Sequence, residues 1–294
     1  MKKGIVILTI MAAWLAMAGV AQASESYTIS VSQIVEHPAL DAVRQGFFDV
    51  FEEKGVPVEK NVHIAQGNIA TANQIASQIL GENPDLVLAI ATPTAQACVQ
   101  KIHDIPILAT AVTDLKEAGL VDSYEAPGAN VSGMTDMSPI AEQVALIQEF
   151  LPEVKTIGVI YNAGEANSVV LVNVLKEVCE GLGIAVEEAT VANSSAVYQA
   201  AKSLVGKCDA VYVPTDNTVI SALEPAVKVF VENQIPFFAA DTDSVERGVI
   251  AALAVDYYRM GRQTAEMALR ILQDGADTAT MPVESLKDLR LYVN

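Results

Sequence analysis

Apolar runs of strand length alternate with amphipathic helical stretches along the chain, and the second half repeats the order of the first. The strand-like segment 27–35 and the helical run 40–53 have counterparts in 155–161 and 168–180. The run 87–91 is continuously apolar, which is typical of a parallel strand buried on both faces. Alternating strands and helices predict parallel sheets covered by helices. We therefore expect an α/β fold of two doubly wound parallel-sheet lobes with a cleft between them.

A segment of different composition links the two halves. Residues 124–138 are rich in Gly, Pro, Asn and Ser and lack a helical period, so we expect part of this segment to cross between the lobes. A return crossing is expected at 241–249, and chain crossings of this kind form a hinge about which lobes close. The predicted division assigns 24–133 and 243–275 to lobe I, and 134–242 and 276–294 to lobe II.

The first 23 residues have the layout of a secretory signal peptide. Lys2 and Lys3 precede an apolar run, 4–20, and Ala-Gln-Ala follows at 21–23. We expect cleavage after Ala23 and a periplasmic protein. A membrane anchor is the alternative, which the short apolar run and the lack of a second apolar span disfavour. No cysteine lies near the cleavage site, so a lipid anchor is not expected.

Charge and motifs narrow the class of function. The net charge of −18 makes binding to nucleic acid improbable, because such a surface repels phosphate backbones. The chain has no Gly-rich phosphate loop, no GxSxG and no HExxH, which disfavours an enzyme. Its three histidines are scattered, so we expect neither a metal site nor a cofactor.

The cysteines could pair in an oxidising compartment. Cys98 is alone in the first half and is expected to pack as a small apolar residue, whereas Cys179 and Cys208 share the second half. A bridge between these two is disfavoured but left open, because the first two helices of a doubly wound lobe usually cover opposite faces of the sheet.

Candidate anion donors follow several predicted strands. In open parallel sheets, ligands bind beyond the carboxyl ends of strands. Thr92 and Thr94 precede one helical run, and Asn167 and Ser168 precede another. Hydroxyls and free backbone N–H groups at a helix N-terminus can hold an anion without a cationic side chain. The alternative is that these residues only cap their helices.

The loops that follow the predicted strands contain several acids and no Lys or Arg; they are 35–38, 91–94, 111–114, 161–168, 214–217 and 240–243. Glu36, Asp114, Glu165, Asp216 and Asp241 could face a positive group, although each could also be a turn residue. Together the two sets favour a cationic or zwitterionic ligand. The full set of predicted ligand-binding residues is His37, Thr92, Thr94, Thr113, Asp114, Tyr161, Glu165, Asn167, Ser168, Asp216, Asn217 and Asp241.

Several strings carry a family resemblance over almost all of the chain beyond residue 23. They are VEHPALDAVRQGF, ATPTAQA, TAVTD, NVSGM, GVIYNAGEANSVV, VPTDNTV and GVIAALAVDYYRMGRQTAEMALRIL. The chain resembles the ABC-transporter substrate-binding proteins that include tryptophan, tyrosine and phenylalanine binders. The resemblance implies a type I periplasmic-binding-protein-like fold with three interlobe crossings, and delivery of the ligand to a membrane permease.

The leading hypothesis is therefore a monomeric solute receptor of an ABC importer, with an aromatic L-amino acid as its ligand. A sensory receptor of the same fold is one alternative. A sugar-binding importer component is another, disfavoured because the candidate loops offer one Tyr for stacking and no Arg. An enzyme acting on a small metabolite is the least favoured reading.

Overall fold

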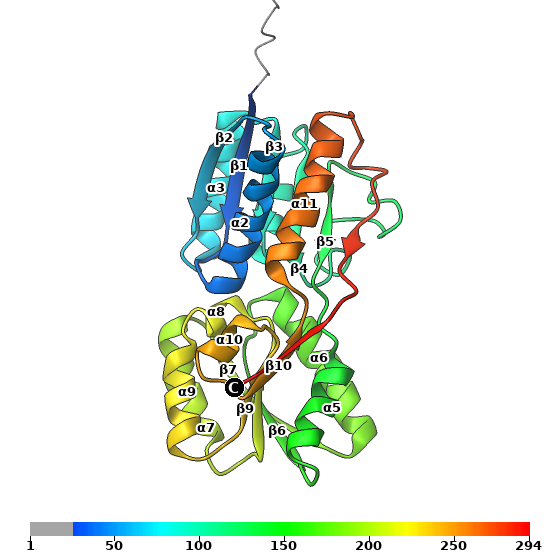
Figure 1. The fold of residues 1–294 in the computed structure, drawn as a ribbon. Helices are drawn as coiled ribbons and strands as arrows, with labels where there is room; N and C mark the ends of the chain where they lie inside the picture. The colour runs from blue at the N-terminus through cyan, green and yellow to red at the C-terminus, as the bar shows by residue number, and fades with distance from the viewer. Residues whose placement is uncertain (1–25) are drawn as a thin grey trace, which may run out of the picture.

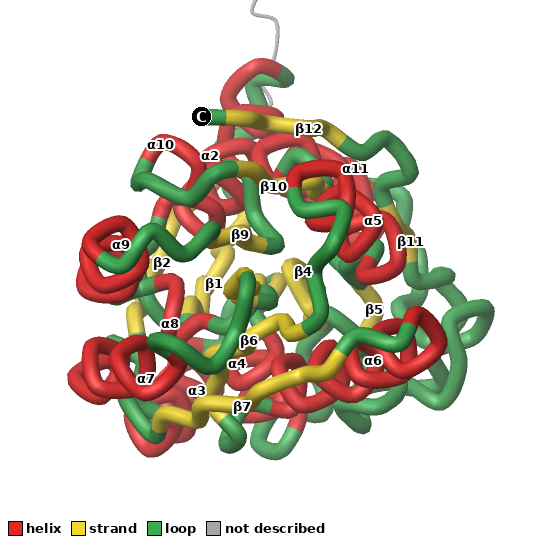
Figure 2. Tube along the Cα trace, turned by 90° about the horizontal axis from the view of Figure 1, so that it is seen from below, coloured by secondary structure: helices red, strands yellow, loops and turns green. Residues whose placement is uncertain are grey.

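The computed structural model describes residues 26–294 as two lobes stacked end to end (Figure 1). Each lobe contains a six-stranded sheet, and helices lie around the strands when the molecule is seen from below (Figure 2). The expected signal peptide and its cleavage site lie outside the described residues. None of the helices in the described part has the length and apolar character needed to span a bilayer.

Lobe I is built on a parallel sheet of order β11-β5-β4-β3-β1-β2. Its strands are β1 (Tyr27–Gln33), β2 (Val58–Ile64), β3 (Leu86–Ile90), β4 (Ile107–Val112), β5 (Val131–Thr135) and β11 (Glu284–Ser285). Its helices are α2 (Pro38–Glu53), α3 (Ile69–Glu82), α4 (Thr92–Val99) and α11 (Tyr257–Leu272). Every residue of β3 is buried, as expected for a central strand covered on both faces.

Lobe II repeats this arrangement with order β12-β10-β9-β8-β6-β7, in which only β12 is antiparallel to its neighbour. Its strands are β6 (Thr156–Asn162), β7 (Ala185–Val191), β8 (Ala210–Val213), β9 (Phe237–Ala239), β10 (Ala251–Ala254) and β12 (Arg290–Val293). Its helical segments are α5 (Ile140–Phe150), α6 (Ala166–Leu182), a 3-10 turn (Ser194–Ala196), α7 (Val197–Leu204), α8 (Asn217–Ile220), α9 (Leu223–Glu232) and α10 (Asp243–Glu246). The predicted doubly wound two-lobed fold is confirmed.

The chain passes between the two sheets three times within the described residues, at 136–139, 255–256 and 286–289. The last passage is the red segment that descends from the upper to the lower lobe in Figure 1. The sheet pairing differs from the division expected from sequence at two strands. β10 pairs with β9 of lobe II although 243–275 was assigned to lobe I, and β11 pairs with β5 of lobe I although 276–294 was assigned to lobe II.

Local pattern explains both differences. β10 reads Ala-Ala-Leu-Ala, and an apolar run of four residues does not indicate which sheet it joins. β11 has two residues, too few for any periodicity. Only α11 of the segment 243–275 packs on lobe I, where it lies against α2.

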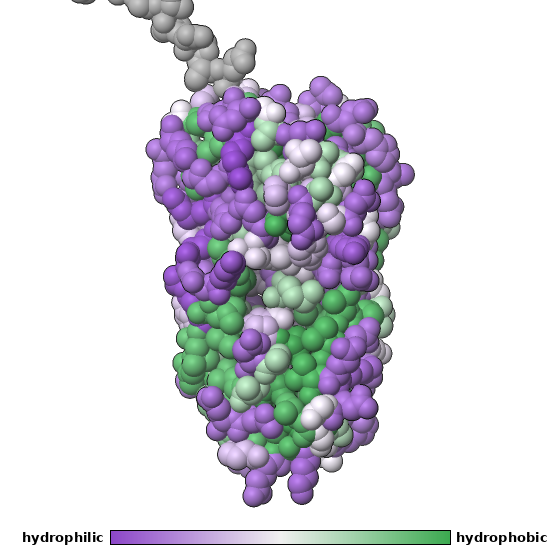
Figure 3. All heavy atoms as spheres, turned by 90° about the vertical axis from the view of Figure 1, so that its right-hand side faces the viewer, coloured by the Kyte–Doolittle hydropathy of each residue, from purple (hydrophilic) through white to green (hydrophobic). Residues whose placement is uncertain are grey.

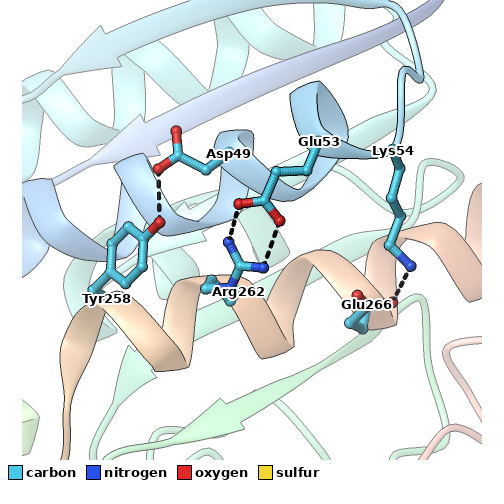
Figure 4. A network of polar contacts seen from close by, with 6 residues as sticks. All are labelled: Asp49, Glu53, Lys54, Tyr258, Arg262 and Glu266. Carbon is cyan, nitrogen blue, oxygen red and sulfur yellow. Dashed lines mark hydrogen bonds and ion pairs between the residues drawn. The ribbon is translucent and has the colours of Figure 1, made fainter.

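The α2–α11 pair is the most extensive helix contact in the molecule. A Cβ on Gly46 of α2 would lie 2.2 Å from the carbonyl oxygen of Tyr258 on α11, so only glycine allows this approach. Three polar contacts run along the solvent side of the pair (Figure 4): Asp49 with Tyr258, Glu53 with Arg262 and Lys54 with Glu266. Exposed ion pairs contribute little stability, so backbone contact and apolar packing hold these helices together.

The three cysteines are free thiols, and the disulfide left open between Cys179 and Cys208 is not formed. Cys98 and Cys179 are buried among apolar side chains. On the surface, hydrophobic residues gather on one face of the lower lobe, lobe II (Figure 3). Exposed apolar side chains of this lobe include Phe150, Leu291 and Val293.

Candidate ligand-binding site

A cavity with about 350 Å³ of unfilled space lies between the lobes. This volume includes space that is open to solvent, so it is an upper bound on the room for a ligand. Lobe I contributes the start of α2 and the segments after β4 and β5, and lobe II contributes α6, α8 and the segments after β8 and β9. The lining residues are His37, Ala39, Leu40, Ala111, Thr113, Asp136, Asn167, Thr215, Asp216, Asn217, Ile220, Asp241 and Tyr257.

The N-terminus of α2 faces this cavity. Its N-cap residue, His37, makes no side-chain capping bond, and Pro38 has no N–H group. The backbone N–H groups of Ala39 and Leu40 precede the first intrahelical bond, which Asp41 makes to the His37 carbonyl. Free N–H groups and the helix dipole together make this end of the helix suited to an anion such as a carboxylate.

His37 is a neutral, buried polar group at the start of α2. Burial, and next the positive charge of Arg247, lower the pKa of its imidazole to about 4. Its Nδ1 atom is buried and has no hydrogen-bond partner among the described residues. Since a buried polar atom without a partner is costly, this atom is available to a bound molecule.

Asp216 caps α8 and is fully occupied by its own lobe. It accepts hydrogen bonds from the N–H groups of Val219 (2.8 Å) and Asn162 (2.6 Å) and from the Ser168 hydroxyl (2.6 Å). Burial, followed by the nearby negative charge of Glu165, raises the pKa of this carboxyl. The side chain therefore holds lobe II loops in place at the wall of the cavity.

Two further acids line the cavity near the hinge. Asp241 accepts hydrogen bonds from the Ser244 N–H group (2.9 Å) and hydroxyl (2.7 Å), one on each carboxyl oxygen. Asp136 accepts one from the Tyr257 hydroxyl at 2.8 Å on Oδ2, while its Oδ1 has no partner among the described residues. Burial raises the pKa of both carboxyls.

Apolar groups form another part of the wall. Ala39 and Leu40 come from α2, Ala111 from the end of β4 and Ile220 from α8. Ala111 has φ +52°, a left-handed conformation that is uncommon for a residue with a Cβ and is found at functional sites more than elsewhere. These side chains, with the ring of Tyr257, offer the cavity an apolar surface for a ligand side chain.

The structure brings together six of the residues predicted from sequence. His37, Thr113, Asn167, Asp216, Asn217 and Asp241 line the cavity. Thr113 and Thr215 approach across the lobes, with their hydroxyl oxygens 3.5 Å apart. Asn167 donates from Nδ2 to the Thr215 carbonyl, and its buried Oδ1 has no partner in the described chain.

Three predicted hydroxyl residues lie behind the wall. Thr94 donates to the carbonyl oxygens of Ile90 and Ala91, so its hydroxyl is used by the residues that precede α4. Ser168 is occupied by Asp216. Thr92 is buried and its hydroxyl has no partner among residues 26–294, but it is not one of the lining residues.

The remaining predicted residues are placed elsewhere. Asp114 accepts from the backbone N–H groups of Lys116 and Glu117 and from the Tyr124 hydroxyl, as a turn residue does. Tyr161 donates to Glu188 on β7, and this bond and burial raise the pKa of the phenol to about 12. Glu165 lies beside an adjacent interlobe groove, where it accepts hydrogen bonds from the two residues that follow Asp216.

Sequence reasoning missed Asp136, Tyr257 and most of the apolar wall. Asp136 follows β5, so the rule that site residues follow parallel strands would have selected it. Tyr257 begins a helix after the second crossing, and no local pattern distinguishes it from a core tyrosine. In the described part of the chain, no cluster of His, Cys, Asp or Glu has the arrangement of a metal site.

One sequence relative and one solved structure match about nine tenths of this chain. A "Tyrosine-binding protein" of Clostridioides difficile (strain R20291) is 41% identical over 270 residues, covering 90% of this chain and 78% of the relative. An ABC domain from Streptococcus pneumoniae, solved in complex with L-Trp, is 32% identical, with a TM-score of 0.88 and 92% of each chain covered.

The two lobes superpose better on those of the L-Trp complex than on those of an open, ligand-free relative. A ligand-free, open structure of a Clostridium difficile substrate-binding protein is 42% identical, yet its TM-score is 0.69 over 91% of this chain and 92% of that one. The L-Trp complex, with lower identity, superposes better, so sequence divergence does not explain the difference. Sugar-binding proteins at 20% identity or less resemble the fold alone.

The family assignment rests on nearly the whole described chain. The family model described as "ABC transporter substrate binding protein" matches residues 28–294, which include both sheets and all three passages between the lobes. Members of this family bind solutes and are not enzymes. The chain belongs to the ABC transporter substrate-binding protein family.

Proposed function

We propose that this protein binds an aromatic L-amino acid between its lobes in the periplasm and, as a monomer, presents it to the permease of an ABC importer. The cavity carries the proposal, because it combines the three features that such a ligand needs. The uncapped N-terminus of α2 suits a carboxylate, buried acids suit an ammonium group, and an apolar wall suits a ring.

The relatives support the class of ligand. One is named for tyrosine and another was solved with L-Trp, and both align with about nine tenths of this chain. A zwitterion also fits the charges of the cavity, whose described lining contains Asp136, Asp216 and Asp241 and no Lys or Arg. A neutral sugar would leave Oδ1 of Asp136, which has no partner in the described chain, without a positive partner.

Ligand binding is coupled to lobe closure in this proposal. His37 on lobe I and Asn217 on lobe II line the same cavity, so a ligand can touch both only when the lobes are shut. A ligand that binds the closed state better shifts the equilibrium toward it. The permease would then distinguish the loaded receptor by the relative position of its lobes.

Indole fluorescence gives a direct test. The chain has one tryptophan, Trp14, so protein that begins at Ser24 contains none. Titrating this protein into free tryptophan should shift the indole emission to the blue as the ring leaves water, with saturation near one ligand per chain. Binding should also raise the melting temperature, because the ligand stabilises only the folded state.

Aliphatic amino acids and sugars serve as controls. Aliphatic side chains should compete poorly because they leave part of the apolar wall uncovered. If tryptophan, tyrosine and phenylalanine all leave the melting temperature unchanged while glucose, galactose or leucine raises it, the aromatic assignment is wrong.

A further inference from the structure

Asp136 and Tyr257 join two of the interlobe crossings at the cavity. Asp136 begins the first crossing, directly after β5, and Tyr257 begins α11, directly after the second. The Tyr257 hydroxyl donates to Asp136 Oδ2 at 2.8 Å, and both side chains are buried. A bond between residues 121 positions apart therefore fixes the carboxylate where the lobes are hinged.

Asp136 differs from the other acids of the cavity in one respect. Asp216 and Asp241 receive protein donors on both of their oxygens. Asp136 has a donor on Oδ2 only, and no donor in the described chain reaches Oδ1 with hydrogen-bond geometry. The Thr113 hydroxyl lies near this carboxyl and favours its charged form, but it does not complete a bond to Oδ1.

The surroundings of this carboxylate are negative. Asp136, Asp241 and Asp243 all act on the Tyr257 phenol, raising its pKa well above the usual value together with the larger effect of burial. Arg247 acts on Asp241, but it is not among the described residues that line the cavity. A buried acid with an unused oxygen and no cationic partner favours a positively charged group from the ligand.

We propose that Asp136 accepts the ammonium group of the ligand through Oδ1 and that Tyr257 is the positioning residue that directs it. This inference deepens the proposed function and rests on it. The ammonium group completes the hydrogen bonding of Asp136, whose other oxygen is held by the second crossing. The ammonium group of the ligand is thereby bound where the chain crosses between the lobes.

Paired ligands that differ only in the amino group test this assignment. L-Tyrosine and 3-(4-hydroxyphenyl)propionate share ring and carboxylate, and their affinities can be measured by calorimetry. The variants are Asp136→Asn, Tyr257→Phe and the double variant. Asp114→Asn is the control, since this acid is held in a turn and does not line the cavity.

The wild type should bind tyrosine at least about 30-fold more tightly than the desamino compound, as for one partner of a buried charge pair. Asp136→Asn should lose about this factor for tyrosine and change the affinity for the desamino compound less than about threefold. Tyr257→Phe should weaken tyrosine binding about tenfold. The double variant should be no weaker than Asp136→Asn, because Tyr257 acts through Asp136.

The outcomes separate this inference from the proposed function. If Asp136→Asn retains wild-type affinity for tyrosine, or weakens both compounds equally, Asp136 is not the ammonium acceptor although the receptor assignment stands. If the wild type binds leucine rather than aromatic amino acids, the same comparison with 4-methylpentanoate decides the role of Asp136. Binding of an uncharged sugar alone would overturn both proposals.

Discussion

Gly261 on α11 lies so close to Val43 on α2 that a Cβ on the glycine would be 1.9 Å from the Val43 carbonyl oxygen. The two helices therefore touch through their backbones. His37 and Tyr257 lie at the N-termini of α2 and α11, and both line the cavity. Close packing of this pair fixes the separation between two cavity residues that are 220 positions apart in sequence.

Gly261→Ala should lower the free energy of unfolding by about 2–4 kcal/mol, because the obstructing atoms are backbone and the helices must separate. Gly181→Ala in α6 is the matched control, since a Cβ there meets nothing within 4 Å. The control should be neutral or stabilising by up to about 1 kcal/mol, since alanine favours helix. Urea denaturation of both variants measures the difference, and equal stabilities would contradict the packing argument.

His37 should make the protein less stable in acid. Its pKa is about 4 in the folded state and 6.5 without burial, so the unfolded chain binds more protons between these values. Stability attributable to this residue is fully present above pH 6.5 and is lost as the pH falls toward 4. The shift corresponds to a loss of about 3 kcal/mol.

His37→Gln provides the comparison, because glutamine is polar and does not titrate. The difference in unfolding free energy between wild type and variant, measured by urea denaturation at several pH values, should change in the variant's favour on acidification from pH 7 to pH 4. The buried acids titrate in both proteins and cancel in this difference. A difference that is independent of pH would show that His37 is not held neutral.

Asp216 and Asp114 should respond differently to removal of the carboxylate. Asp216→Ala leaves the N–H groups of Val219 and Asn162 without their acceptor and should cost about 2–4 kcal/mol of stability. Asp114→Ala exposes its turn N–H groups to water and should cost about 1 kcal/mol or less. Thermal melts of the two variants check this order, which the opposite ranking would refute.

The cysteines should react as three free thiols. A thiol reagent should label Cys98 and Cys179 only after unfolding, because both are buried and burial raises their thiol pKa values to about 12 and about 11. Cys208 is partly exposed and should react slowly in the folded protein. Denatured, unreduced protein should yield three thiols per chain, whereas a single thiol would indicate the Cys179–Cys208 bridge.

Sequence reasoning predicted much of the fold because the two lobes are built from local periodicities. Continuous apolar runs specify buried parallel strands, and the helical runs between them specify their cover. The rule that ligands bind beyond strand ends also selected His37, Thr113 and Asp216, which line one cavity. It could not show which side chains already had partners, so Asp114 and Asp216 were treated alike.

The chain by itself determined the two repeated lobes, the order of strands and helices, and an acidic set of loops without Lys or Arg. Only the tertiary structure decided that β10 pairs with the sheet of lobe II and β11 with the sheet of lobe I. It also decided that α2 and α11 pack closely at Gly46 and Gly261, and that Tyr257 donates a hydrogen bond to Asp136. Periodicity arises from contacts within an element, which local sequence encodes. Partner choice, burial and unused hydrogen-bonding atoms depend on residues that the fold brings together, such as Asp136 and Tyr257 at 121 positions apart, and no local pattern distinguishes one acid or tyrosine from another.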